Sequence, residues 1–118
     1  MLTKKSLRRR KIRYRVRKKI FGTENRPRLS VYRSNKEIYA QVIDDEKGLT
    51  LASFSSRKLK DDVAGKTKSE VSELVGKELG KLTKDAGITT IVFDRGGYLY
   101  HGRVKSLADG VRSEGIIF

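Results

Sequence analysis

Positive charge is gathered at the N-terminal end of this chain, and this asymmetry constrains the fold more than any other feature. Residues 1–36 hold fifteen of the 28 Lys and Arg residues but only one of the 14 acidic residues, which gives this stretch the whole net charge of +14. Residues 37–118 hold equal numbers of basic and acidic residues and sum to zero. The leading segment cannot be neutralised from within itself. The sequence therefore predicts a neutral folded body that carries a cationic arm for a polyanion.

Length and composition narrow the class of protein. A chain of 118 residues suffices for one domain and is too short for two. The absence of cysteine excludes disulfides and thiolate metal sites, and no apolar run approaches the ~20 residues that span a bilayer. The arm has few hydroxyl residues, which argues against an organelle transit peptide. We expect a cytoplasmic protein with no cofactor, no bound metal, no membrane partner and no small-molecule substrate.

The arm, residues 1–22, has the pattern of a helix that needs a partner. Neither Gly nor Pro interrupts it, Thr3 is a suitable N-cap, and Gly22 is placed to end the helix in a left-handed conformation. Arginines at spacing four repel one another along the helix, and the apolar line beside them is too narrow to anchor it. We expect the arm to be disordered alone and helical once phosphates neutralise it.

Residues 23–118 have the pattern of one globular domain of the α/β (α+β) class. Strands are expected over residues 28–34, 38–44, 49–55 and 88–93, the last one parallel to one of the first three. A capping box at Thr67 and Glu70 begins a helix that ends at Gly87, and a second amphipathic helix ends near Gly115. The order β-β-β-α-β-α predicts a mixed β-sheet of about four strands with helices packed on it. Residues 57–66 are polar, charged and without periodicity, and we expect a loop there. The register of the third strand stays open.

Three groups of residues are candidates for RNA binding, and arginine predominates among their charges, which favours bidentate phosphate contacts. The arm contributes Arg8, Arg9, Arg10, Lys11, Arg13, Arg15, Arg17, Lys18 and Lys19. The outer face and tip of the first hairpin, where aromatic rings could stack on unpaired bases, contribute Arg28, Tyr32, Arg33, Ser34, Asn35, Lys36, Tyr39 and Gln41. A glycine-rich segment that lets a backbone approach closely contributes Arg95, Gly96, Gly97, Tyr98, Tyr100, His101, Gly102, Arg103 and Lys105.

Catalytic and metal chemistry find little support in the sequence. The glycine-rich segment lacks the spacing of a P-loop or a dinucleotide fingerprint, and His101 is the only histidine. The acidic residues 44–46 are typical of a hairpin turn. No paired acid and base or activated nucleophile can be assembled, so we expect no enzyme.

Two long motifs resemble a known family. The runs RPRLSVYRSNK at residues 26–36 and IYAQVIDD at residues 38–45, together with FDRGGY at residues 93–98 and YHGRVK at residues 100–105, resemble the bacterial large-subunit ribosomal protein numbered eighteen. The resemblance covers essentially the whole chain. The sequence departs from the family pattern at Glu37, where a histidine is expected, and at Gly110 and Val111, where alanines are expected.

The resemblance implies a structural constituent of the large ribosomal subunit. Such a protein binds 5S rRNA and, beside a neighbouring ribosomal protein numbered five, helps to attach it to 23S rRNA in the central protuberance. It also implies that the arm, the hairpin and the glycine-rich segment contact RNA. Two rival functions stay open: a nonspecific architectural protein that compacts DNA with the same arm, and a small hydrolase or nuclease centred on Asp94 and His101.

Overall fold

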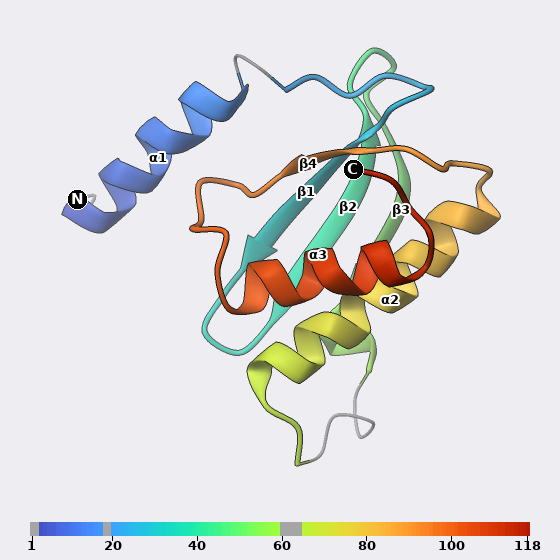
Figure 1. Cartoon of the computed structure of the whole chain (residues 1–118). Helices are drawn as coiled ribbons and strands as arrows, with labels where there is room; N and C mark the ends of the chain where they lie inside the picture. The colour runs from blue at the N-terminus through green and yellow to red at the C-terminus, as the bar shows by residue number, and fades with distance from the viewer. Residues whose placement is uncertain (1–2, 18–19, 60–64) are drawn as a thin grey trace.

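Four strands form a single mixed sheet, and two helices cover one of its faces (Figure 1). The computed structural model describes residues 3–17, 20–59 and 65–118. Its elements are α1 (Lys4–Arg17), β1 (Arg28–Arg33), β2 (Ile38–Asp44), β3 (Leu49–Ser55), the short 3-10 helix η1 (Ser56–Lys58), α2 (Lys68–Asp85), β4 (Val92–Asp94) and α3 (Arg103–Ser113). The strand order is β3-β2-β1-β4, with β4 parallel to β1 and the other neighbours antiparallel. The predicted α+β class is confirmed.

Alternation along the first hairpin builds the sheet side of the core. Leu29 and Val31 of β1 and the inward residues of β2 are at most 3% exposed, as predicted. On the opposite face Tyr32 lies across from Tyr39, with ring centroids 5.8 Å apart. The register of β3, which the sequence left open, places it antiparallel to β2 with an irregularity between Val42 and Ile43.

The last strand is shorter than the apolar run predicts. Residues 88–93 were expected to form it, but β4 begins only at Val92. The preceding residues run beside the C-terminus, where the backbone N–H of Ile91 donates to the carbonyl of Ile117 at 3.1 Å. Ile91 is nevertheless fully buried. Burial therefore explains the apolar pattern, whereas the neighbouring backbone decides where strand pairing starts.

Glycines let α2 and α3 approach each other closely. The N-terminus of α2 is capped as expected, because the Thr67 hydroxyl accepts from the backbone N–H of Glu70 at 3.2 Å. A Cβ on Gly76 would lie 2.1 Å from the carbonyl oxygen of Leu107, and one on Gly110 would lie 2.3 Å from that of Glu73. Gly110 thus lowers the intrinsic helix propensity of α3 but makes room for the backbone of α2.

Replacing Gly76, where α2 crosses α3, should destabilise the fold. We expect Gly76→Ala to lower the free energy of unfolding by about 2 kcal/mol, although alanine gains about 1 kcal/mol of helix propensity, because the methyl group meets backbone. Gly80→Ala on the same helix is the matched control, since its methyl group meets mainly the side chain of Glu114. Chemical denaturation of the two variants measures the difference. Equal stabilities would contradict the role of Gly76.

The start of the chain contains a confirmed cap and a corrected end. The Thr3 hydroxyl accepts from the backbone N–H of Ser6 at 3.0 Å, as expected of an N-cap. Gly22, predicted to end the helix in a left-handed conformation, lies after the end of α1 and has no positive φ. Its N–H donates to Asp45 at 2.8 Å, and a Cβ there would lie 2.5 Å from the backbone nitrogen of Arg28. Gly22 is therefore a packing residue of the body.

Candidate nucleic-acid interface

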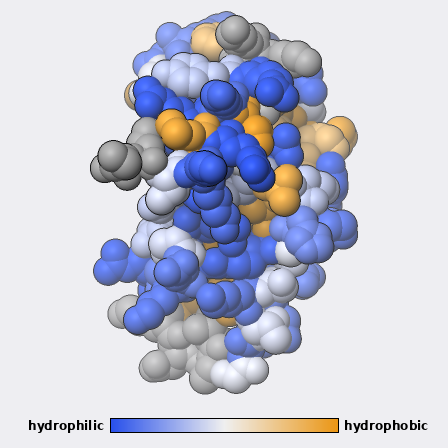
Figure 2. Space-filling view, turned by 90° about the vertical axis from the view of Figure 1, so that its left-hand side faces the viewer, coloured by the Kyte–Doolittle hydropathy of each residue, from blue (hydrophilic) through white to orange (hydrophobic). Residues whose placement is uncertain are grey.

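The side of the molecule on which α1 lies is strongly hydrophilic. Figure 2 shows this side, with hydrophilic residues over most of it and only small hydrophobic areas between them. The predicted arm residues Arg8, Arg10, Lys11, Arg13 and Arg15 are all exposed. None of the described Lys and Arg side chains of α1 forms an ion pair with a described carboxylate. These cations are therefore available to an outside anion.

Part of the predicted arm site lies beyond what the structure describes. Lys18 and Lys19 are outside the described residues, and so is the side chain of Arg17. Arg9 contacts the body directly, because its guanidinium lies 5.1 Å from the centre of the Tyr98 ring. The arm and the glycine-rich segment are thus neighbours in space, although Arg9 and Tyr98 are 89 positions apart in sequence.

The first hairpin presents most of its predicted residues to solvent. Tyr32 is 60% exposed, Gln41 is exposed, and Tyr39 is half-buried beside Tyr32. At the tip, Ser34, Asn35 and Lys36 are exposed. The carbonyl oxygen of Ser34 accepts from Nη1 of Arg103 at 2.9 Å. The tip therefore lies beside the start of α3.

Arg28 is the hairpin residue that the structure places elsewhere. Its Nε lies 2.9 Å from Asp45 and its Nη1 lies 2.8 Å from Asp94, and its side chain is only 12% exposed. Burial lowers the pKa of Arg28, but hydrogen bonds and charges from the two carboxylates outweigh burial and raise that pKa above its ordinary value. The guanidinium is occupied by protein groups, so the structure gives Arg28 a structural place and does not bring it to the exposed surface.

The glycine-rich segment is shaped by the same ion pairs. Asp94 accepts from the backbone N–H of Gly96 at 2.9 Å through its second oxygen. Gly97 has a φ of +81°, and a Cβ there would lie 2.5 Å from the carbonyl oxygen of Arg9. A side chain at this position would push α1 away. Gly97 therefore allows the backbone of α1 to approach the body closely.

Tyr98 supports neighbouring arginines and is not an open stacking platform. It is only 7% exposed, and its hydroxyl donates to the carbonyl of Arg33 at 3.1 Å and accepts from the N–H of the same residue at 3.2 Å. The guanidinium groups of Arg9 and Arg33 each lie 5.1 Å from its ring centre. Tyr98 was predicted as part of the glycine-rich segment that lets a backbone approach closely, and the structure makes it a support for two cations.

The remaining predicted residues of the glycine-rich segment differ in their exposure and in the contacts that their side chains make. Tyr100 accepts from Arg112 at 2.9 Å and packs edge-on against Phe93, while Lys105 pairs with Asp109 at 3.1 Å on the surface. His101 is exposed, and Gly102 is the N-cap residue of α3. Arg95 is half-buried. Of this group, Tyr100, His101 and Lys105 are exposed.

Arg103 is an arginine without a carboxylate partner among the described residues. Its Nε is buried and has no hydrogen-bond partner there. Burial and the nearby charge of Arg33 lower the pKa of Arg103, against smaller opposite effects of Glu37 and Tyr98. Arg33 and Arg103 therefore lie near each other at the end of the hairpin, and both line the same cavity.

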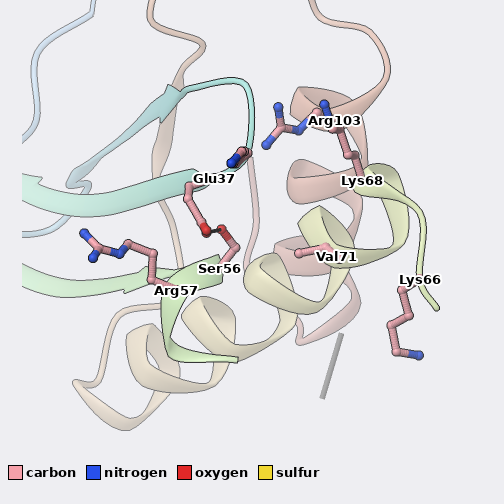
Figure 3. A pocket seen from close by; sticks show the side chains of 8 residues that line it. Glu37, Ser56, Arg57, Lys66, Lys68, Val71 and Arg103 are labelled. Atoms are coloured by element: carbon pink, nitrogen blue, oxygen red, sulfur yellow. Dashed lines mark hydrogen bonds between the residues drawn. The ribbon is translucent and has the colours of Figure 1, made fainter. Parts of the chain in front are cut away.

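Two hollows meet at Arg103, and they contain cations that sequence reasoning missed. A cavity of about 550 Å³ separates α1 from the body and includes Lys5 and Lys68 in its wall. A smaller hollow of about 280 Å³ includes Arg57, Lys66 and Lys68 (Figure 3). The sequence did contain a signal, since positive charges surround the capping box of α2. The sequence alone does not say which surface of the molecule those charges face, because that depends on how α2 packs in the tertiary structure.

The smaller hollow is the weaker anion site. In Figure 3 the carboxylate of Glu37 points toward Ser56 and accepts a hydrogen bond from its hydroxyl. Arg57 and Lys66 extend away from each other. Glu37 stands where the resemblance predicts histidine, and its negative charge makes this hollow less suited to a phosphate.

The alternatives to nucleic-acid binding gain no support from the described residues. Asp44 accepts from the backbone N–H groups of Glu46 and Lys47, as a turn-forming residue does. Within residues 3–17, 20–59 and 65–118, no group of three metal-ligating side chains is assembled. Asp94, one residue of the hydrolase alternative, is 3% exposed and engaged by Arg28. The part of the chain that the structure describes contains no helix long and apolar enough to cross a membrane.

Comparison with known proteins gives the family. Residues 2–118 match the family model described as ribosomal L18 of archaea, bacteria, mitochondria and chloroplast. The chain is 57% identical over 118 residues to the large ribosomal subunit protein uL18 of Porphyromonas gingivalis, with both chains covered completely. It is 56% identical over 117 residues to uL18 of Bacteroides thetaiotaomicron, covering 99% of this chain and 100% of the relative. The chain therefore belongs to the ribosomal protein L18 family, whose members are structural components of the ribosome and not enzymes.

Proposed function

We propose that this chain binds 5S rRNA in the large ribosomal subunit and helps to attach it to 23S rRNA in the central protuberance, beside ribosomal protein five. The single observation that carries the proposal is the set of α1 cations that have no carboxylate partner among the described residues and lie beside the glycine-rich segment. Exposed arginines without acidic partners bind phosphates, and the exposed Tyr32 offers a flat ring to a base. Membership of the L18 family supports the same partner.

The two parts of the chain have different tasks in this proposal. Residues 1–22 supply most of the electrostatic attraction and become firmly helical when phosphates neutralise them, since arginines at spacing four repel one another in the free chain. Residues 23–118 form the body, and their fixed surfaces select the shape of the RNA. A protein with these partners works on cytoplasmic ribosomes.

Competition between RNA and DNA tests the proposal against its rival. We expect duplex DNA of equal length to displace labelled 5S rRNA only at about 10³-fold excess at moderate salt, because the body recognises RNA shape as well as charge. Filter binding measures the displacement. Displacement at equal concentration would favour the nonspecific architectural function and exclude the proposed one. The RNA that co-purifies after a high-salt wash gives an independent readout.

A further inference from the structure

The cavity between α1 and the body has the composition of an anion site. Its wall includes Lys5, Arg8 and Arg9 from α1 and Arg33, Lys68 and Arg103 from the body. Among the described residues that line it, none is Asp or Glu. Six cations around one hollow repel one another, and this repulsion acts across the boundary between arm and body. An anion in the hollow would turn the repulsion into attraction.

The body side of the cavity also contains hydrogen-bond donors without partners among the described residues. The Nε of Arg103 is buried and lacks a partner among the described residues. The N-terminus of α3 opens beside it, where the N-cap residue is Gly102, no side chain caps the helix, and the first turn has no acidic residue. Free backbone N–H groups at a helix start favour negative charge. Gly102 and Arg103 both line the cavity, so this helix start lies in the same wall as the cations of the body.

The contact between α1 and the body is narrow apart from this cavity. Arg9 crosses the Tyr98 ring, and the backbone of α1 touches Gly97. Both contacts bring cations of the arm closer to Arg33, which lies over the same ring. The docked position of α1 therefore concentrates like charges, and an anion bound between them would stabilise it.

We infer that this cavity binds one phosphate group of an unstacked RNA segment, and that this phosphate holds α1 against the glycine-rich segment. The inference rests on the proposed RNA-binding function and adds a specific site to it. The volume of about 550 Å³ has room for a nucleotide around the phosphate. Lys68, which the sequence analysis did not select, becomes a phosphate-binding residue from α2.

The docking of α1 can be measured with two spin labels. The chain has no cysteine, so cysteines introduced at the exposed positions Tyr14 and Lys84 are labelled uniquely. We expect a broad distribution of distances in chloride buffer and a narrow one with a single-stranded oligouridylate. Inorganic phosphate at the same ionic strength distinguishes the source: narrowing with both ligands assigns the site to phosphate in general, and narrowing with RNA alone assigns it to a phosphodiester. A distance distribution that is equally narrow in chloride buffer would overturn the inference. So would a distribution that stays broad with both the oligouridylate and inorganic phosphate.

A charge-matched pair of variants tests the site itself. Lys68→Gln should raise the RNA concentration needed to dock α1 by about tenfold, because one phosphate contact is lost. Lys66→Gln, two residues earlier and outside the wall of this cavity, should leave that concentration unchanged. Equal effects of the two substitutions would mean that only net charge matters and would refute the site.

A pair of glycine variants tests whether α1 docks at the glycine-rich segment. Gly97→Ala should prevent the narrow distance distribution, because its methyl group meets the backbone of Arg9. Gly48→Ala is the control, since Gly48 has a similar φ of +66° with nothing within 4 Å of an added Cβ.

Measuring 5S rRNA binding and α1 docking on the wild-type protein separates this inference from the proposed function. If wild-type protein binds 5S rRNA while α1 stays undocked, the inference fails and the proposed function stands. If it does not bind 5S rRNA, the proposed function fails.

Discussion

Removal of residues 1–19 lowers the affinity for 5S rRNA by about 10³-fold or more at physiological salt. The deleted segment contains eleven Lys and Arg residues and no acidic residue. If about six of these cations engage phosphates, the slope of log affinity against log salt becomes shallower by about 5, because fewer counterions are released. Filter binding over a salt series measures both quantities. The deletion stops before Gly22 because that residue packs between β1 and the Asp45 turn.

The body should remain folded after this deletion, and this distinguishes loss of contacts from loss of structure. The buried core consists of residues of the sheet, α2, α3 and the segments around β4. We expect the free energy of unfolding to change by less than about 1 kcal/mol. Unchanged affinity and an unchanged salt slope in a folded protein would refute the role of the arm.

Substitution of Arg28 should destabilise the protein strongly while leaving the electrostatics of RNA binding intact. Arg28→Met leaves Asp45 and Asp94 without their shared cation, and their side chains are only 11% and 5% exposed. Breaking such a buried pair from one side costs about 3 kcal/mol. Because Asp94 also holds the N–H of Gly96, the glycine-rich segment should loosen as well. Urea denaturation measures the loss of stability.

The salt slope decides whether Arg28 also contacts RNA. A phosphate contact contributes about 0.9 to the slope, so Arg28→Met should leave the slope unchanged if the guanidinium serves only its carboxylates. Arg26→Met removes the same charge from an exposed position two residues earlier and should change stability by less than about 0.5 kcal/mol. A stable Arg28→Met protein with a reduced slope would restore Arg28 to the RNA-binding surface.

Local rules in the sequence determined much of this protein. The charge of the arm is a property of composition, and the alternation of residues 28–33 and 38–44 fixes which faces are buried because the side-chain period of a strand is two. The capping box at Thr67 begins α2 where expected, since its hydrogen bond spans only three residues. These features depend on near neighbours, so they are visible without a structure.

The tertiary structure alone decided which predicted residues are free to bind and which hold the site together. Arg28 meets Asp94 across 66 positions, and Tyr98 meets Arg33 across 65, so neither partnership leaves a local pattern. Lys68 belongs to the wall of the arm cavity only because α1 and α2 are brought to the same side of the body. The physical reason is that the local sequence pattern specifies which residues are buried and which are charged. Packing between segments far apart in the sequence specifies which charged side chains contact one another.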